Sequence, residues 1–513
     1  MTCPRIASAS PAAGGLAIAR PVPKPAAAFL VLAGLAVSLG GCATFSPDAG
    51  LSVAQATAAA ELAKSITKVT TDAEAATVRA QIDRLAKSSL TPDSAVQIAL
   101  LNNRGLQAAF NDLGKSEADF VQATLPPAPR FSYERLTGPG ELELTYQVVA
   151  SVFDLATLPA RTRIAERRFR AAQYRAAEEV LRLAAEARRQ YFRAVAANQS
   201  VGFLEQALAT AASASEIAQQ LGETGALNKL EQAREHAFYA ELGAQLAKAR
   251  VQQKVEREAL IRQLGLWGRD TDFRLPSSLP PLPKRVETGT ALEAEALRKR
   301  IELQVARADL GALAFEYKLG NATRFISALD VGFLSNPETT TVTDVTADGT
   351  ATTTTERIKR RGPTIEFSIP IYDFGESAVR GAKEAYMAAA NRLAERAVNA
   401  RSEVREAYLR YRGNYDITRH YQSTVLPLNK TIQDQALLQY SGMLVDVSQL
   451  IIDARARILS NVQAIEAQRD FWIAATDLKA AIIGGGFGSG PGEGASGSTT
   501  TAAEGGASGA EGG

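Results

Sequence analysis

Three observations predict a mainly α-helical protein that carries a membrane β-barrel and is built from duplicated long-helix hairpins. The first is a segment from Pro159 to about Leu221 with helix-forming composition and apolar residues at helical spacing. At ~1.5 Å per residue, a helix of ~60 residues would be ~90 Å long, which is more than a globular domain needs. The second observation is a later copy of this segment, and the third is a pair of alternating strands before each copy.

The copy lies at a constant offset along the chain. The segment Glu186–Arg193 corresponds to Glu403–Arg410, an offset of 403 − 186 = 217. Gly225 and Gly442, which follow the two long segments, are separated by the same 442 − 225 = 217 residues. A period of this length indicates a duplicated structural half rather than a short solenoid repeat.

The chain therefore divides into five parts. We expect a lipoprotein signal peptide over residues 1–41, an N-terminal periplasmic segment over 42–90, a first repeat over 91–283, a second repeat over 284–483 and a tail over 484–513. The tail is rich in glycine and serine, a composition typical of disordered low-complexity sequence.

Composition excludes several classes of function. The balance of 57 Lys+Arg against 55 Asp+Glu gives no reason to expect nucleic acid as a partner. Two histidines (His236 and His420) and two cysteines (Cys3 and Cys42) favour neither a His/Cys metal site nor a disulfide framework. We find no nucleophile–base pair and no cofactor fingerprint, so neither an enzyme nor a cofactor is expected. No apolar run of about 18 residues follows residue 45, so no spanning helix is expected there.

The N-terminus reads as a targeting segment. Basic residues precede an apolar run over residues 26–39, which ends at Leu39-Gly-Gly-Cys42. Small residues before a cysteine resemble the bacterial lipoprotein signal, in which that cysteine is lipidated and becomes the mature N-terminus. With Ala43 rather than aspartate after it, the resemblance implies the outer membrane. The alternative is an ordinary signal peptide that contains a cysteine.

The first repeat combines helices with a strand pair. A helix starts at the N-cap Thr91 and reaches Thr124, before a proline-rich stretch. A strand Phe131–Glu134 pairs with a longer strand Glu141–Phe153, whose apolar residues alternate with polar ones. The long helix follows, and a return helix covers Leu227–Leu264.

The second repeat follows a proline-rich linker, residues 275–284. Its expected elements are a helix Ala291–Leu319, strands Phe325–Phe333 and Ile365–Ile371, a long helix Glu376–Tyr440 and a return helix Val447–Ile482. We interpret the threonine-rich stretch Asn336–Gly362 between the two strands as a loop. In each repeat the two shorter helices together match the long one in length, so we expect them to stack end to end beside it.

Strands with one apolar and one polar face suit a membrane barrel as well as a soluble sheet. The export signal and the position of each hairpin between long helices favour the barrel. Four strands cannot close a barrel, because ~8 is the practical minimum. The chain is therefore expected to oligomerise.

These features resemble the TolC-type outer-membrane efflux family. The matching segments are Leu90–Asn103, Pro370–Gly375, Leu426–Pro427, Tyr440–Gly442 and Leu450–Ala454, in order, within a resemblance that covers residues 90–484. The resemblance implies a homotrimer, with a twelve-stranded outer-membrane barrel of four strands per protomer that continues into an α-helical tunnel in the periplasm. Two departures occur: Phe153-Asp-Leu-Ala156 lacks the glycine found at Gly375, and the stretch from Met443 to Leu450 is longer than usual.

The function implied by the resemblance is a passive conduit for solutes, supplied by an inner-membrane pump through a periplasmic adaptor protein. A type I protein-secretion duct is the main alternative. A trimeric coiled-coil adhesin would show sustained heptads without alternating hairpins, so the strands argue against it. The cargo is not indicated by the sequence.

Two groups of residues are candidate functional sites. Gly222, Gly225 and Gly442 mark the turns where the long helices reverse, and glycine there permits positive φ. Near the second turn, the resemblance implies an aperture of tyrosine and aspartate side chains, for which the candidates are Tyr440, Asp446 and Asp453; Asp453 could instead pair with Arg455 or Arg457. The second group is a basic run beside the threonine-rich stretch, made of Arg357, Lys359, Arg360 and Arg361. We expect it either to contact lipopolysaccharide phosphates or to be a solvated end of a loop.

Overall fold

The computed structural model describes residues 45–225, 227–286, 288–289, 291–345, 349, 351–442, 444–445 and 447–486. The first repeat contains α4 (Pro92–Asn102), α5 (Arg104–Thr124), β1 (Arg130–Gly138), β2 (Glu141–Ser151), α6 (Val152–Glu223) and α7 (Lys229–Leu264). The second contains α8 (Leu292–Lys299), α9 (Ile301–Ala322), β3 (Ala328–Val345), β4 (Ala351–Ser368), α10 (Glu376–His420), the π-turn η3 (Tyr421–Val425), α11 (Leu426–Ser441) and α12 (Val447–Ile483). None of the helices in the described part of the chain is both long and apolar enough to cross a membrane.

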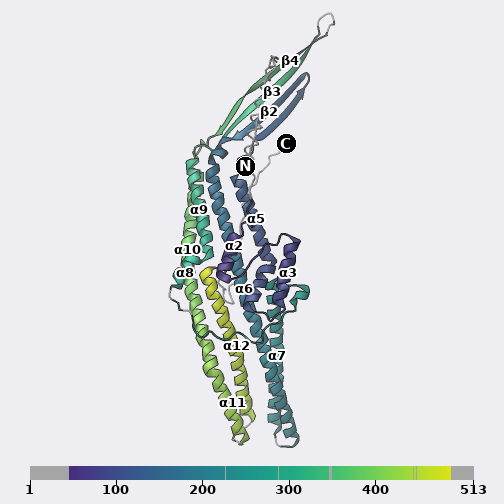
Figure 1. The fold of residues 1–513 in the computed structure, drawn as a ribbon, viewed down its shortest axis with the longest axis vertical. Coiled ribbons are helices and arrows are strands. Elements are labelled where there is room, and N and C mark those ends of the chain that lie inside the picture. Colours follow the sequence, from purple (N-terminus) through teal and green to yellow (C-terminus); the bar gives the residue numbers. More distant parts are fainter. Residues whose placement is uncertain are drawn as a thin grey trace, which may run out of the picture. The chain divides into compact units, whose positions relative to one another are not determined.

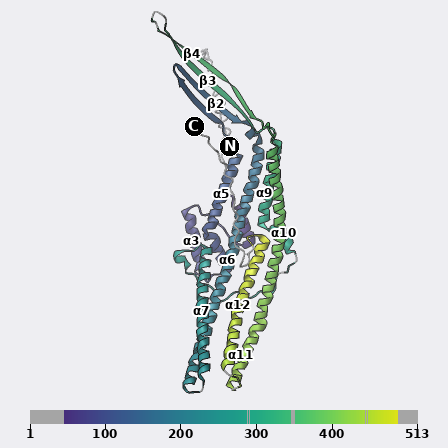
Figure 2. The same ribbon diagram turned by 180° about the vertical axis from the view of Figure 1, so that it is seen from behind.

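The shorter helices stack end to end beside the long ones, as the sequence predicted (Figures 1 and 2). Helix α7 ends at Gly265, which packs against the backbone of Asn102 and Asn103 where α5 begins. Likewise, α12 ends against Ile301, the first residue of α9. Both junctions lie beside the 72-residue helix α6, which contacts α5, α7, α9 and α12.

Polar side chains set several helix ends. Thr91 and Ser94 form a capping box at the start of α4, with Pro92 in the first turn. Asn103 has an extended backbone, and its side chain accepts a hydrogen bond from the Leu106 N–H, which starts α5 as a separate helix. The single helix expected over 91–124 is therefore two helices.

Helix α6 begins earlier than predicted. Ser151 caps it by accepting a hydrogen bond from the Asp154 N–H, so the helix starts at Val152, directly after β2, rather than at Pro159. Pro159 lies inside the helix, where it lacks the N–H of one helical hydrogen bond but does not end the helix.

The four strands form one antiparallel sheet in the order β1-β2-β3-β4. The central β2–β3 pair joins the two repeats, and β1 and β4 are the edges. The threonine-rich stretch was predicted to be a loop, and this prediction is wrong. Strands β3 and β4 run through most of it and are paired from Ala328↔Ser368 to Val345↔Ala351. Threonine is β-branched and favours strands, and Thr341 lies 3.4 Å from Thr355 across the pair, measured between hydroxyl oxygens.

Residues 45–90 lie against the helices. This segment contains α2 (Ser52–Thr57), the π-turn η1 (Ala58–Leu62) and α3 (Asp72–Ala86). The Ser46 N–H donates to Glu117 of α5 at 2.7 Å, and the Gln173 side-chain amide of α6 donates to the Gly50 carbonyl at 3.2 Å. After α7, the 3₁₀ turn η2 (Gly268–Thr271) is held to α3 by an Arg79–Asp270 ion pair.

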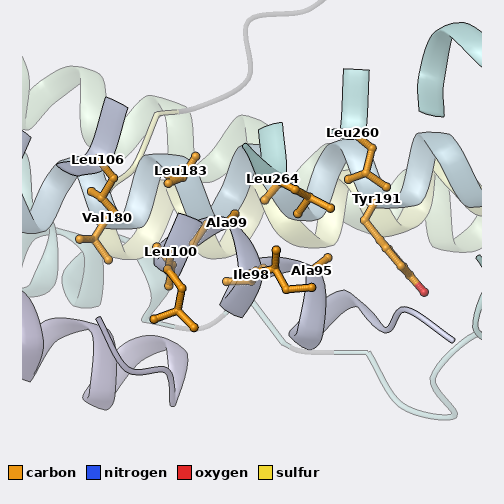
Figure 3. Packing of buried hydrophobic residues seen from close by; sticks show 14 of the residues in the cluster. Ala95, Ile98, Ala99, Leu100, Leu106, Val180, Leu183, Tyr191, Leu260 and Leu264 are labelled. Atoms are coloured by element: carbon orange, nitrogen blue, oxygen red, sulfur yellow. The ribbon is translucent and has the colours of Figure 1, made fainter. Parts of the chain in front are cut away.

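The main core lies where α4 and α7 meet the middle of α6 (Figure 3). Buried side chains from the three helices pack together there, among them Ala95, Ile98, Leu100, Val180, Leu183, Leu260 and Leu264. Tyr191 is 1 % exposed, and its hydroxyl donates to the Leu90 carbonyl at 3.0 Å. A second core lies between α8, α10 and α12 around Phe471.

Candidate functional site

The sheet has one apolar and one polar face, and its register defines both. The register has no bulge from β1 to β4, so directly opposite residues form rows across the sheet. One such row contains Tyr133, Tyr146, Ser335 and Arg361. Side chains alternate between the faces of a strand, so the face of any residue follows from this row. The apolar face contains Phe131, Tyr133, Leu142, Leu144, Tyr146, Val148, Leu329, Val331, Phe333, Ile365 and Phe367.

The apolar face is exposed to a degree that is unusual for a soluble sheet. Phe131 is 74 % exposed, Ile365 is 67 % and Phe367 is 63 %. Large exposed apolar patches mark contacts with a membrane or a partner. Tyr133 and Tyr146 lie side by side, with ring centroids 5.2 Å apart. Their row lies at the boundary between the apolar rows and the rows that contain basic residues. In membrane barrels, aromatic residues are found at such boundaries of the apolar band.

The basic run is divided between the two faces. Arg357, Lys359 and Arg361 are at odd positions of β4 and extend the apolar face upward from the tyrosine row. Arg360 is on the polar face, where its guanidinium pairs with Glu338 of β3 at 2.8 Å. The four side chains therefore do not form one cluster. Arg135 of β1 is on the same face as Arg357, Lys359 and Arg361, in the row of Lys359. The sequence analysis missed it, although its odd position on β1, shared with Phe131 and Tyr133, indicates this face.

The three glycines at the hairpin tips have different roles. Only Gly225 has positive φ, at +78°, which favours glycine. Gly222 lies in the last turn of α6, where a Cβ would meet the side-chain amide of Gln232. Gly442 has φ −86° and caps α11 with an ordinary backbone. The expectation of positive φ is therefore wrong for Gly222 and Gly442.

At the second tip the aperture candidates are partly described. Tyr440 is half-buried at the end of α11. Asp453 is half-buried on α12 and accepts a hydrogen bond from Gln449 at 3.0 Å. Its alternative partners are engaged elsewhere, because Arg455 pairs with Glu241 at 2.9 Å and Arg457 contacts Gln433. Asp446 lies outside the described residues, as does the lipidation candidate Cys42.

A groove of about 900 Å³ runs along α6 between α7 and α12. Its upper end contains a buried ion pair, in which Arg189 Nε lies 2.6 Å from a carboxylate oxygen of Asp477. A second nitrogen of Arg189 donates to the Gly486 carbonyl at 2.7 Å. These contacts tie the end of α12 to the middle of α6.

A half-buried carboxyl group lies above this groove. Burial, followed by the nearby negative charge of Glu302, raises the pKa of Glu178 to about 7, although Arg396 opposes the rise. Glu302 itself pairs with Arg300, which is 4 % exposed at the break between α8 and α9. This break, like that at Asn103, divides a helix that was expected to be single.

No protein-family model matches the sequence, and no curated protein matches it. Solved structures do match. CusC, whose structures describe transmembrane channel formation, aligns with a TM-score of 0.64 and 16% identity, over 77% of this chain and 92% of CusC. The outer membrane channel CmeC of Campylobacter jejuni aligns with a TM-score of 0.63 and 16% identity, over 77% of this chain and 86% of CmeC.

The outer membrane protein VceC of Vibrio cholerae gives a TM-score of 0.62 at 14% identity, over 80% of this chain and 97% of VceC. The chain has the fold of these outer membrane proteins. This channel fold combines the long helices with the small antiparallel sheet, as the sequence predicted. At such low identity the likeness establishes the fold alone.

Proposed function

We propose that this protein is an outer-membrane channel, a passive conduit for solutes in a tripartite efflux assembly. The observation that carries the proposal is the sheet, which has an exposed apolar face and an opposite polar face and whose strand β2 leads directly into the long helix α6. A lipid-facing apolar band with a polar interior is the pattern of a membrane barrel. The channel fold supports the same function.

A homotrimer accounts for the unpaired edges of the protomer. Strands β1 and β4 have open edges, and three copies would supply the twelve strands of a closed barrel. The outermost helices also expose apolar side chains, including Leu230, Val251 and Val255 on α7 and Leu409, Leu428 and Leu437 on α10 and α11. Neighbouring copies would cover both sets.

Lipidation of Cys42 fits the position of the chain that follows it. Ser46 is bonded to Glu117, which lies seven residues, or ~10 Å, before the end of α5 that leads to the sheet. Four residues reach at most ~14 Å, so lipid on Cys42 could meet the membrane beside the sheet. Mass spectrometry should detect the acyl group, and a free Cys42 thiol in the wild-type protein would contradict this proposal.

The hairpin tips would form the periplasmic aperture, where an adaptor protein delivers solute from an inner-membrane pump. Asp446 and Asp453 would each be repeated around the axis, and a ring of carboxylates attracts cations. In planar bilayers, the double variant Asp446→Ala and Asp453→Ala should conduct more in its resting state or lose block by divalent cations. Conduction identical to the wild type in both respects would place the aperture elsewhere.

Channel activity itself is tested by adding the purified protein to planar bilayers. We expect discrete conductance steps of uniform size, because each trimer would be one pore. Protein that remains folded in the bilayer without any steps would contradict a channel function.

A further inference from the structure

The charged residues of the sheet are sorted by face. Every acidic residue on the four strands is on the polar face: Glu134, Glu141, Glu143, Asp330, Glu338, Asp344, Glu356 and Glu366. Four of the six basic residues, Arg135, Arg357, Lys359 and Arg361, are on the opposite, apolar face. Only Arg130 and Arg360 share the acidic face. This separation follows from strand register alone.

Five of these acids, Glu134, Glu141, Glu143, Glu338 and Glu356, occupy three consecutive rows near the β1–β2 turn, and we name them the acidic belt. Each row is two residues above the last, so the belt covers ~14 Å of strand length. Arg360 is the only cation in these rows of the polar face, and it pairs with Glu338.

The acidic belt includes a pair of like charges that destabilises the sheet. Glu143 and Glu338 lie directly opposite each other on β2 and β3, and like charges in that position are destabilising. The two carboxylates are relieved by separate groups: Arg360 pairs with Glu338, and the Asn336 side-chain amide donates to Glu143 at 2.5 Å. Glutamine at these positions would avoid the repulsion, so folding does not explain the choice of glutamate.

We propose that the acidic belt makes the barrel section of the pore selective for cations. This inference rests on the proposed channel function, because only a closed barrel turns the polar face into a pore wall. A threefold assembly would repeat each belt carboxylate three times around a pore with low-dielectric walls, which raises the local concentration of cations and lowers that of anions. Cationic and zwitterionic solutes would pass this section more readily than anionic ones.

The belt acts as a diffuse field rather than as a metal site. Within the described part of the chain, no three His, Cys, Asp or Glu side chains converge closely enough to hold a metal ion. A diffuse field is screened by salt over a Debye length of about 10 Å at 0.1 M. Selectivity should therefore be strong in dilute salt and fade as the salt concentration rises.

The experiment measures the potassium-to-chloride permeability ratio from the reversal potential across a KCl gradient in planar bilayers. The wild type should prefer potassium. The belt variant, Glu141→Gln with Glu143→Gln and Glu356→Gln, should lower the ratio by roughly threefold or more and bring it near unity, since local counter-ion enrichment of about tenfold or more is typical of charged clefts. Glutamine retains hydrogen bonding and removes like-charge repulsion, so this variant should fold.

A matched control removes three charges from the other face of the same sheet, in the variant Arg357→Gln, Lys359→Gln and Arg361→Gln. Its permeability ratio should equal that of the wild type. A wild type without preference, a belt variant that retains the preference, or a control that changes it equally would each overturn the inference while leaving the channel function standing. Absence of any conductance would defeat both.

Discussion

At the scale of single residues, Arg189 and Asp477 form a buried ion pair between the two repeats. Both side chains are 9 % exposed, and Arg189 also binds the Gly486 carbonyl. Removal of one member of a buried pair typically costs about 3–5 kcal/mol, because a charge is left without its partner. Arg189→Leu should therefore lower the unfolding midpoint strongly.

The double variant Arg189→Leu, Asp477→Leu is the control for this prediction. It removes both charges, and apolar replacement of a whole buried pair is often neutral. Denaturation of the detergent-solubilised proteins should show that the double variant recovers much of the lost stability. A single variant as stable as the wild type would contradict the importance of the pair.

We expect the stability of the protein to depend on pH because of Glu178. Its pKa of about 7 lies above the ordinary value of a glutamate, so the folded protein binds the proton more tightly than the unfolded chain does. The resulting stabilisation is complete below the unfolded value of 4.5 and is lost as the pH rises through 7. At ~1.36 kcal/mol per pKa unit, the effect is at most roughly 3 kcal/mol.

Glu178→Gln should remove this part of the pH dependence. Glutamine resembles the protonated carboxyl group, so at pH 8 the variant should unfold at a higher denaturant concentration than the wild type, and at pH 5 the two should be similar. Glu179→Gln is a neighbouring control that changes one charge on the same helix. Parallel stability curves for Glu178→Gln and the wild type between pH 5 and 8 would exclude this role for Glu178.

At the scale of elements, we expect the basic residues of β4 to contact lipopolysaccharide. Arg357, Lys359 and Arg361 form a column on the apolar face of the sheet, from the tyrosine row upward, and their guanidinium and ammonium groups suit phosphate. Their replacement by glutamine should reduce the lipopolysaccharide that copurifies with the protein. Arg360→Gln is the matched control on the polar face. Equal losses in both variants, or none in either, would contradict the contact.

Alternation and helical spacing predicted most elements, but not their breaks and extensions. The strand pair expected over Phe131–Glu134 and Glu141–Phe153 is present, because its apolar residues recur with a period of two, but β1 extends to Gly138 and β2 ends at Ser151. The threonine-rich extension of β3 and β4 was missed, because threonine is polar by composition yet favours strands through its β-branch. The break at Asn103 combines a local cap with a contact to the Gln263 carbonyl, and the break at Arg300 involves an ion pair with Glu403, so local sequence patterns alone did not predict them.

The candidate sites were less predictable than the fold. Composition identified the basic run on β4 but not its division between two faces, which needs the register of the neighbouring strands. The acidic belt was also invisible, because its members come from all four strands. The role of Gly222 depends on Gln232 of the next helix rather than on its own φ.

At the scale of the whole molecule, the two repeats are held together by the β2–β3 pair and by the contacts of α6 with α9 and α12. The same arrangement leaves β1 and β4 as open edges. An open sheet with a lipid-facing side has no stable place in a membrane, because unpaired backbone groups cannot be hydrated there. A sheet placed in the membrane would therefore require assembly with other copies, as we propose.

The mass of the purified protein in mild detergent distinguishes a trimeric channel from a single chain. Light scattering or native mass spectrometry should give three chains per particle, each with its sheet intact by circular dichroism. The trimer should resist dilution, since every protomer would satisfy its strand edges through its neighbours. A stable monomer that retains the folded strands would contradict the account of this protein as a channel built from three copies.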